Sequence, residues 1–260
     1  MSELKERSVT LNGVAARVWE KGEGAPIGYF PGYGGAPRWH SFLDELAKKR
    51  RVIVPSLPGF PGGGLGHLKL DSHLDWVLAA GDLLDLSGLA GADLIGVGFG
   101  GALAADVAAV LPQKVRRLVL ISSYGLYDEK DPITNIWAQR PGAAPKVLCA
   151  RPERFKELTA MPNDASPVEW PIEMVRATEA GARYLWPFGN THLDRRLGRI
   201  KQPVLLLRGS EDKVIPASYQ QKFAFAIGAS AKTQTINGAG HLAELDEPEA
   251  VAKAILDFTE

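Results

Sequence analysis

The chain has 260 residues, with 30 Lys and Arg against 30 Asp and Glu, so it carries no formal net charge at neutral pH. This balance argues against a broad positive surface of the kind that binds nucleic acid or anionic lipid. The first residues are polar, and no stretch reaches the roughly 18 uninterrupted apolar residues of a membrane span. We therefore expect a soluble, cytoplasmic protein whose partner is a small hydrophobic molecule, with no nucleic acid and no membrane involved.

Cysteine and histidine usage argues against a disulfide framework and a metal site. Cys149 is the only cysteine, which excludes an internal disulfide and a thiolate cage. It lies in a Pro-rich segment far from the other reactive motifs, so it is a poor candidate nucleophile. The five histidines are scattered, without His-x-His or His-Glu-x-x-His spacing. We expect no metal and no cofactor.

Short apolar runs alternate with helix-sized amphipathic segments along the chain. Residues 8–20 alternate apolar and polar around Asn12-Gly13, a pair favoured in two-residue hairpin turns. Further strands are predicted at 27–30, 51–55, 93–97, 117–121, 204–207 and 232–236. Helices are predicted at 39–48, 74–86, 102–111, 218–227 and 248–258. This alternation predicts an α/β fold, with a mostly parallel sheet covered by helices on both faces.

Residues 124–195 break this alternation. They are rich in Pro and aromatic residues, with helical stretches but no clear strand. A loop of about 70 residues without structure of its own would be exceptional. We interpret the segment as a helical cap inserted into a core domain formed by residues 1–123 and 196–260. An elaborate surface excursion is the alternative.

The aromatic side chains of this segment are candidates for a substrate pocket. They are Trp137, Trp170, Trp186, Tyr184 and Phe188. Such residues line pockets for flat or apolar molecules, although they also form the core of small helical units. The composition favours an aromatic or hydrophobic carbonyl compound as the substrate.

Residues 93–109 combine an apolar strand, a glycine-dense turn and a helix of small residues. Gly96, Gly98 and Gly101 satisfy the G-x-G-x-x-G pattern of dinucleotide-binding turns. That pattern requires an acidic residue about twenty positions later, at the end of the next strand, and this strand ends in Ile121-Ser122-Ser123. The alternative is a G-x-S-x-G nucleophile elbow, in which Gly98 occupies the serine position. The missing acid favours the elbow.

Four further segments, in order along the chain, carry a resemblance to a known family. Residues 30–35, Phe-Pro-Gly-Tyr-Gly-Gly, resemble a His-Gly-x-Gly oxyanion loop with Pro31 in place of His, and residues 56–60, Ser-Leu-Pro-Gly-Phe, resemble a D-x-P-G-[FY] turn. Residues 208–216 resemble a G-x-x-D-x-x-[VI]-P segment, and residues 237–241 resemble a G-x-G-H loop. Together they make the chain similar to the α/β-hydrolase superfamily, in its capped esterase and C–C-bond hydrolase branch.

The resemblance implies a mostly parallel eight-stranded sheet and a defined set of site residues. In such enzymes a histidine base, oriented by an acid, activates a serine, and backbone N–H groups stabilise the oxyanion. His241 corresponds to the base, Asp212 to the acid, and Gly98 stands at the nucleophile position. Phe99 and Tyr33 would supply the oxyanion N–H groups.

Four other residues at the ends of predicted strands have side chains that suit the same roles. Asp128, just after a predicted strand, is a second candidate for the acid. Ser122, Ser123 and Ser210 lie at strand ends but lack the elbow context that would let them replace the missing nucleophile.

Three hypotheses follow. The Asp212–His241 dyad activates water or moves a proton in the space left by the serine. Alternatively, the chain is a nucleophile-deleted variant of a serine hydrolase, or a non-catalytic protein that holds a small apolar ligand.

Overall fold

The computed structural model describes residues 2–140, 142–163, 165–186 and 190–260. Eight strands form one sheet in the order β1-β2-β4-β3-β5-β6-β7-β8. Their bounds are β1 Lys5–Leu11, β2 Val14–Lys21, β3 Pro26–Phe30, β4 Arg51–Pro55, β5 Ala92–Val97, β6 Val115–Ile121, β7 Val204–Gly209 and β8 Ala231–Ile236. The predicted fold class, an eight-stranded α/β-hydrolase sheet, is confirmed.

The sheet is antiparallel at one edge and parallel elsewhere. β1 and β2 form a hairpin whose turn residues, Asn12 and Gly13, both have positive φ, and β2 pairs antiparallel with β4. From β4 to β8 every pairing is parallel. Parallel strands need crossover connections, which the predicted helices supply. Because their carboxyl ends share one edge, side chains that follow these strands meet there.

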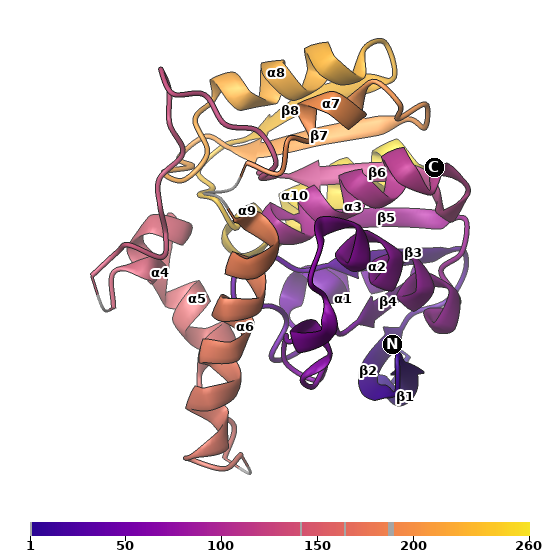
Figure 1. Cartoon of the computed structure of the whole chain (residues 1–260), viewed down its shortest axis with the longest axis vertical. Coiled ribbons are helices and arrows are strands. Elements are labelled where there is room, and N and C mark those ends of the chain that lie inside the picture. Colours follow the sequence, from indigo (N-terminus) through magenta and orange to yellow (C-terminus); the bar gives the residue numbers. More distant parts are fainter. Residues whose placement is uncertain (1, 141, 164, 187–189) are drawn as a thin grey trace.

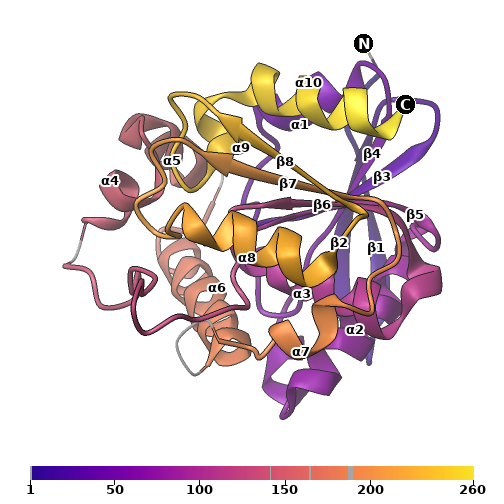
Figure 2. The same cartoon turned by 90° about the horizontal axis from the view of Figure 1, so that it is seen from above.

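Helices cover both faces of the sheet (Figure 1, Figure 2). One face carries α1 (Ser41–Ala47) and α10 (Pro248–Thr259), with the short α9 (Ala243–Asp246) beside them. The other carries α2 (His73–Ser87), α3 (Gly98–Val110), α7 (Asp194–Leu197) and α8 (Ser218–Ile227). Two short 3₁₀ helices, η1 (Gly66–Lys69) and η2 (Pro112–Lys114), complete the core. None of the described helices is both long and apolar enough to cross a membrane.

Within residues 124–195 the structure describes three helices ahead of α7, and no strand in the parts that it describes. They are α4 (Ala144–Leu148), α5 (Pro152–Thr159) and α6 (Glu169–Leu185). They lie together at one end of the sheet (Figure 2). Helix α6 contacts the core where Tyr184 packs edge-on against Phe99, 5.3 Å between ring centroids. The division into a core and a cap, with its boundaries, stays a prediction.

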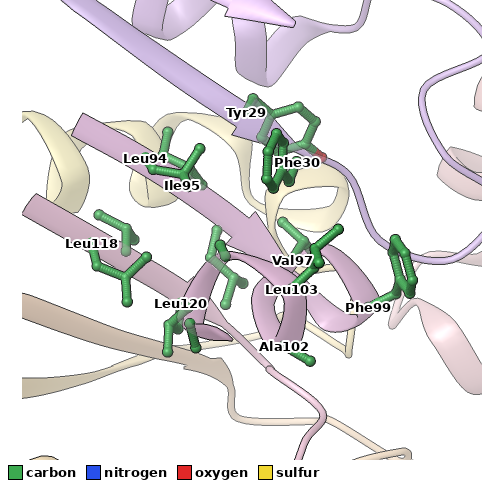
Figure 3. Close-up of a cluster of buried hydrophobic side chains, with 14 of the residues drawn as sticks. Tyr29, Phe30, Leu94, Ile95, Val97, Phe99, Ala102, Leu103, Leu118 and Leu120 are labelled. Atoms are coloured by element: carbon green, nitrogen blue, oxygen red, sulfur yellow. The ribbon is translucent and has the colours of Figure 1, made fainter. Parts of the chain in front are cut away.

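The centre of the core lies between β5 and α3. All six residues of β5 are buried, and so are the first twelve residues of α3. Figure 3 shows the chain passing from β5 into α3 just after Val97, with Phe99 pointing away from the sheet. The small side chains of α3 allow close packing on the sheet, so the elbow is held rigidly by its surroundings.

Candidate active site

Helix α3 begins directly at Gly98, which has φ of +48°. Its neighbours Gly96 and Gly100 are required by packing: a Cβ on Gly96 would lie 2.5 Å from the carbonyl oxygen of Gly100, and a Cβ on Gly100 would overlap the carbonyl oxygens of Phe30 and Pro31. These glycines therefore let α3 approach the strands closely. Close packing alone explains why Gly96 and Gly100 are glycines, so dinucleotide binding is not needed to account for them.

His241 and Asp212 meet beside this turn, although they are 29 residues apart in the sequence. Nδ1 of His241 lies 3.3 Å from Oδ2 of Asp212, and both side chains are fully buried. Oδ1 of Asp212 accepts hydrogen bonds from the N–H groups of Val214 and Ile215, at 2.8 and 3.0 Å. These two bonds hold the carboxylate in place, so it aligns the imidazole. We refer to the pair as the dyad.

Burial alone would raise the pKa of Asp212, but the interaction with His241 and the N–H groups of Ile215 and Val214 outweigh it and lower the pKa from its ordinary value. The carboxyl is therefore ionised at neutral pH. An ionised Asp212 can accept a hydrogen bond from Nδ1–H of His241, and in the tautomer that donates this bond Nε2 is free to accept a proton.

The free nitrogen of the dyad points toward the elbow. Nε2 of His241 is buried, with no hydrogen-bond partner among the described residues. A Cβ built on Gly98 would lie 3.1 Å from this nitrogen, with Tyr124 Cε2 as its next neighbour at 3.6 Å. A hydroxyl carried on that Cβ would be within hydrogen-bonding reach of Nε2. The position of Nε2 relative to residue 98 is therefore compatible with the predicted nucleophile elbow.

Two backbone N–H groups are candidates for oxyanion stabilisation. Phe99 is the second residue of α3, in the first turn, where N–H groups have no intrahelical acceptor. Tyr33 lies in a turn closed by the N–H of Gly35, which donates to the carbonyl of Gly32 at 3.0 Å. That turn has positive φ at Gly34, typical of type II, and its hydrogen bond leaves the Tyr33 N–H unused.

The alternative residues lie elsewhere. Asp128 is paired with Lys222 at 2.6 Å, so the carboxylate in contact with His241 is Asp212. Ser123 donates its hydroxyl proton to the carbonyl of Tyr124. Ser122 and Ser123 line a separate small hollow beside α8, and the Ser210 hydroxyl accepts the N–H of Gly238.

A narrow apolar pocket lies between the elbow and α6, with a free volume of about 10 Å³, roughly enough for one water molecule. It is lined by Tyr33, Gly34, Phe60, Phe99, Tyr124, Ile136, Trp137, Ala177, Thr178, Gly181 and Leu185. We call it the aromatic pocket. Larger hollows elsewhere on the described surface, including one of about 710 Å³ beside Arg17, are more open to solvent and share no residue with the elbow or with the oxyanion candidates. The narrow pocket is the better candidate for substrate, because Tyr33, Phe99 and Tyr124 line it beside the elbow.

Only one of the three predicted pocket tryptophans lines it. Trp137 does so, but Trp170 lies on the open hollow beside Arg17, and Trp186 is 78% exposed. Trp170 is 15 positions before Leu185 on α6, about 22 Å along the helix at 1.5 Å per residue, so the two ends of α6 face different surroundings. Tyr184 packs against Phe99, and Phe188 lies outside the described residues.

Two residues at the site were not anticipated from the sequence. Asp246 accepts the N–H groups of Gly240, Ala150 and Arg151 at 2.8 to 2.9 Å, which ties the loop carrying His241 to the start of α5. Tyr124 lines the aromatic pocket, and its ring lies edge-on to His241 at 5.5 Å. The one sequence feature that could suggest this role for Asp246 is its position shortly after the loop that carries His241.

Comparisons with known proteins agree with the fold. The model of the "Alpha/beta hydrolase family" matches residues 28–254. A 2-hydroxymuconate semialdehyde hydrolase from Pseudomonas sp. (strain CF600) is 27% identical, with 97% of this chain and 93% of that protein covered. A 2-hydroxy-6-oxo-2,4-heptadienoate hydrolase from Pseudomonas putida is also 27% identical, covering 97% and 95%. A solved meta-cleavage product hydrolase from Pseudomonas fluorescens has a TM-score of 0.78 at 20% identity, covering 97% of each chain.

The fold and the family model define the class: the chain belongs to the α/β-hydrolase family. Within that family it is close to the hydrolases of meta-cleavage products. Among the described residues, no group of three or more His, Cys, Asp or Glu side chains could hold a metal ion.

Proposed function

We propose that the protein hydrolyses an ester bond, or a C–C bond next to a carbonyl group, in a small hydrophobic or aromatic substrate, with water as the nucleophile. One observation carries the proposal. The unpartnered Nε2 of His241 points at the place where a side chain of residue 98 would begin, and Gly98 has no side chain there. The attacking water would lie beyond that place, about where a serine hydroxyl would be. The relatives named as hydrolases of 2-hydroxymuconate semialdehyde and of 2-hydroxy-6-oxo-2,4-heptadienoate support the choice of reaction.

In this mechanism Nε2 of His241 takes a proton from the water as the oxygen attacks the carbonyl carbon. Asp212 stabilises the imidazolium that forms. The carbonyl oxygen becomes an oxyanion, which the N–H groups of Phe99 and Tyr33 would bind. The carbonyl then reforms, the bond to the leaving group breaks, and the leaving group takes the proton from His241. The products are a carboxylic acid and an alcohol, or a carboxylic acid and a protonated carbon fragment.

The proposal includes the segment 124–195 as a cap. Helix α6 supplies four of the residues that line the aromatic pocket, and Trp137 supplies part of another wall. A cap that excludes water from the bound substrate strengthens the electrostatic interactions within the site. The cap would also restrict the substrate to small, flat molecules.

The test is turnover of 2-hydroxymuconate semialdehyde and of 4-nitrophenyl acetate by the wild type and by His241→Ala. The dyad mechanism predicts turnover by the wild type and its loss in His241→Ala. His192→Asn is the matched control, because His192 is exposed and its positive φ suits asparagine. Equal turnover in wild type and His241→Ala would overturn the proposal.

A second candidate function is non-catalytic binding of a small apolar ligand. It is favoured by the apolar lining of the pocket and by the complete burial of His241. Unchanged ligand affinity in His241→Ala, together with no product from the wild type, would support binding over hydrolysis.

A further inference from the structure

The aromatic pocket is too small in this structure for the substrate that the proposed function requires. Its free volume is about 10 Å³, whereas small-molecule sites usually offer about 300–1,000 Å³. Space for a substrate therefore requires one wall of the pocket to move. Helix α6 supplies four of the lining residues, Ala177, Thr178, Gly181 and Leu185.

Helix α6 is loosely attached to the rest of the molecule. At 17 residues it is the longest described helix, but it packs extensively against none of the other described helices or strands. It exposes Val168, Ile172 and Val175 to solvent, so the described chain does not obstruct a movement in that direction. By contrast, α5 packs against α9, and Asp246 ties the start of α5 to the loop that carries His241. The α5 part of this segment is therefore held in place, whereas α6 is not.

The C-terminal end of α6 is anchored by Tyr184. Its hydroxyl donates to Asp106 of α3 at 2.7 Å, and both side chains are buried. Its ring also packs edge-on against Phe99 and stacks on His73, 4.6 Å between centroids. This end of the helix is therefore the pivot for a movement of α6, and the displacement grows toward the N-terminal end.

Two side-chain hydrogen bonds hold the middle of α6 against the loop that follows β4, and we call them the latches. Oε2 of Glu179 lies 2.7 Å from Nε2 of His67. Oε1 of Glu173 accepts the N–H of Gly62 at 3.0 Å. These two glutamates lie five and eleven residues before Tyr184, about 7.5 and 16.5 Å along the helix. Between them is the turn of α6 that lines the aromatic pocket, so the latches hold the pocket closed.

The latch at His67 leaves one hydrogen bond of the closed position unmade. Burial acts to raise the pKa of Glu179, but hydrogen bonds from Arg183 and His67 outweigh it and lower the pKa. The carboxylate is therefore ionised at neutral pH and accepts the proton of Nε2. Nδ1 of His67 is buried, with no partner among the described residues. Outward movement of α6 would let water reach both nitrogens, so hydration offsets part of the free energy lost with the latch.

We propose that α6 is a gate over the aromatic pocket, which pivots near Tyr184 and is held closed by the latches at His67 and Gly62. Breaking the latches admits the substrate, while α5 and the loop that carries His241 stay in place. The inference rests on the proposed function for the assignment of the aromatic pocket as the substrate site. It adds to that function the residues that control entry.

Labelling of a thiol in the pocket wall measures opening without any need for turnover. Ala177 is 1% exposed and lines the pocket, and Ala177→Cys adds a single atom there. The rate at which iodoacetamide labels this thiol, divided by its rate in urea, reports how often the pocket opens. Cys149, which is 2% exposed and directly precedes the residues tied by Asp246, reports on the fixed part of the same chain. The thiol at position 177 should be labelled at least about tenfold faster than Cys149 on this scale, because local opening costs less than global unfolding.

Glu179→Met and Glu173→Met each remove the acceptor of one latch. Each should raise the labelling rate at position 177 by about five- to tenfold, the usual effect of one hydrogen bond, and leave that of Cys149 unchanged. Glu157→Met is the matched control, because Glu157 is an exposed glutamate on α5 that pairs with Arg154 of the same helix. It should change neither rate.

Equal protection of the two thiols would overturn the inference, because it would mean that the pocket opens only when the whole chain unfolds. Unchanged labelling at position 177 in both latch variants, an equal rise at both thiols, or a rise in Glu157→Met as large as that in Glu179→Met would overturn it as well. Absence of turnover with the expected labelling pattern would overturn the proposed function alone, since labelling reports the gate and not the chemistry. Turnover without that pattern would overturn the gate alone.

Discussion

Replacing Gly98 with serine tests the geometry of the elbow most directly, with alanine as the matched control. Both substitutions place a Cβ at φ of +48° and 3.1 Å from Nε2 of His241. A non-glycine residue in this region costs about 1–2 kcal/mol, and the imidazole must shift by a few tenths of an ångström. At about 2–4 °C per kcal/mol for a chain of this size, both variants should melt several degrees below the wild type, by similar amounts.

The two variants should differ in chemistry. In Gly98→Ser the hydroxyl lies within reach of Nε2, so His241 can take its proton during attack on an ester. We expect Gly98→Ser to release 4-nitrophenol from 4-nitrophenyl acetate at least about 100-fold faster than Gly98→Ala, the low end of general-base catalysis. Mass spectrometry should detect an acetyl adduct on Gly98→Ser alone. A folded Gly98→Ser variant with no adduct and no advantage over Gly98→Ala would refute the elbow geometry.

Three further predictions concern the residues around the dyad. Asp212→Asn should lower kcat by about 10³–10⁴-fold with little change in the circular dichroism spectrum, because the amide favours the wrong tautomer of His241; a loss below tenfold would contradict this role. Burial raises the pKa of Glu244 to about 8, so between pH 4.5 and 8 the native state keeps a proton that the unfolded state releases. The free energy of unfolding should therefore fall by up to about 5 kcal/mol as the pH rises through this range. Denaturant titrations across that range should give a much flatter profile for Glu244→Gln, and an identical slope would refute the buried proton. Asp246→Ala removes the acceptor of three N–H groups, so urea unfolding should show a loss of about 2–4 kcal/mol, whereas a loss below 0.5 kcal/mol would contradict its role as a tether.

The strands of the core could be predicted because their signals are local. The Asn12-Gly13 turn and the apolar run at Arg51–Pro55 determine their own conformation, and both match the structure. The sequence pattern predicts a helix that starts at residue 102, whereas α3 starts four residues earlier, at Gly98. Glycine is a poor helix former, so residues 98–101 do not read as helix, but their burial against β3 and β5 overrides that propensity.

Asp212 and His241 lie in contact beside Gly98, whereas two of the three candidate pocket tryptophans lie away from the aromatic pocket. The motif around His241 encodes a short loop next to a strand end, and the parallel sheet brings such loops together. Trp170 and Trp186 face away from the pocket because the direction of α6 depends on packing between residues far apart in the sequence. The tether from Asp246 to Ala150 spans 96 residues and carries no local pattern at all.

The burial of the dyad bears on the choice between hydrolysis and simple binding. A buried polar pair is weak evidence for stability, because the cost of removing both groups from water offsets most of the gain from the hydrogen bond between them. Here His241 also keeps an unpartnered Nε2, which adds to the cost of burial. A protein that only held an apolar ligand would gain stability from apolar side chains at both positions. The polar pair is therefore better explained by proton transfer at Nε2, and under the proposed mechanism the oxygen that gives up the proton is that of water rather than of a serine hydroxyl.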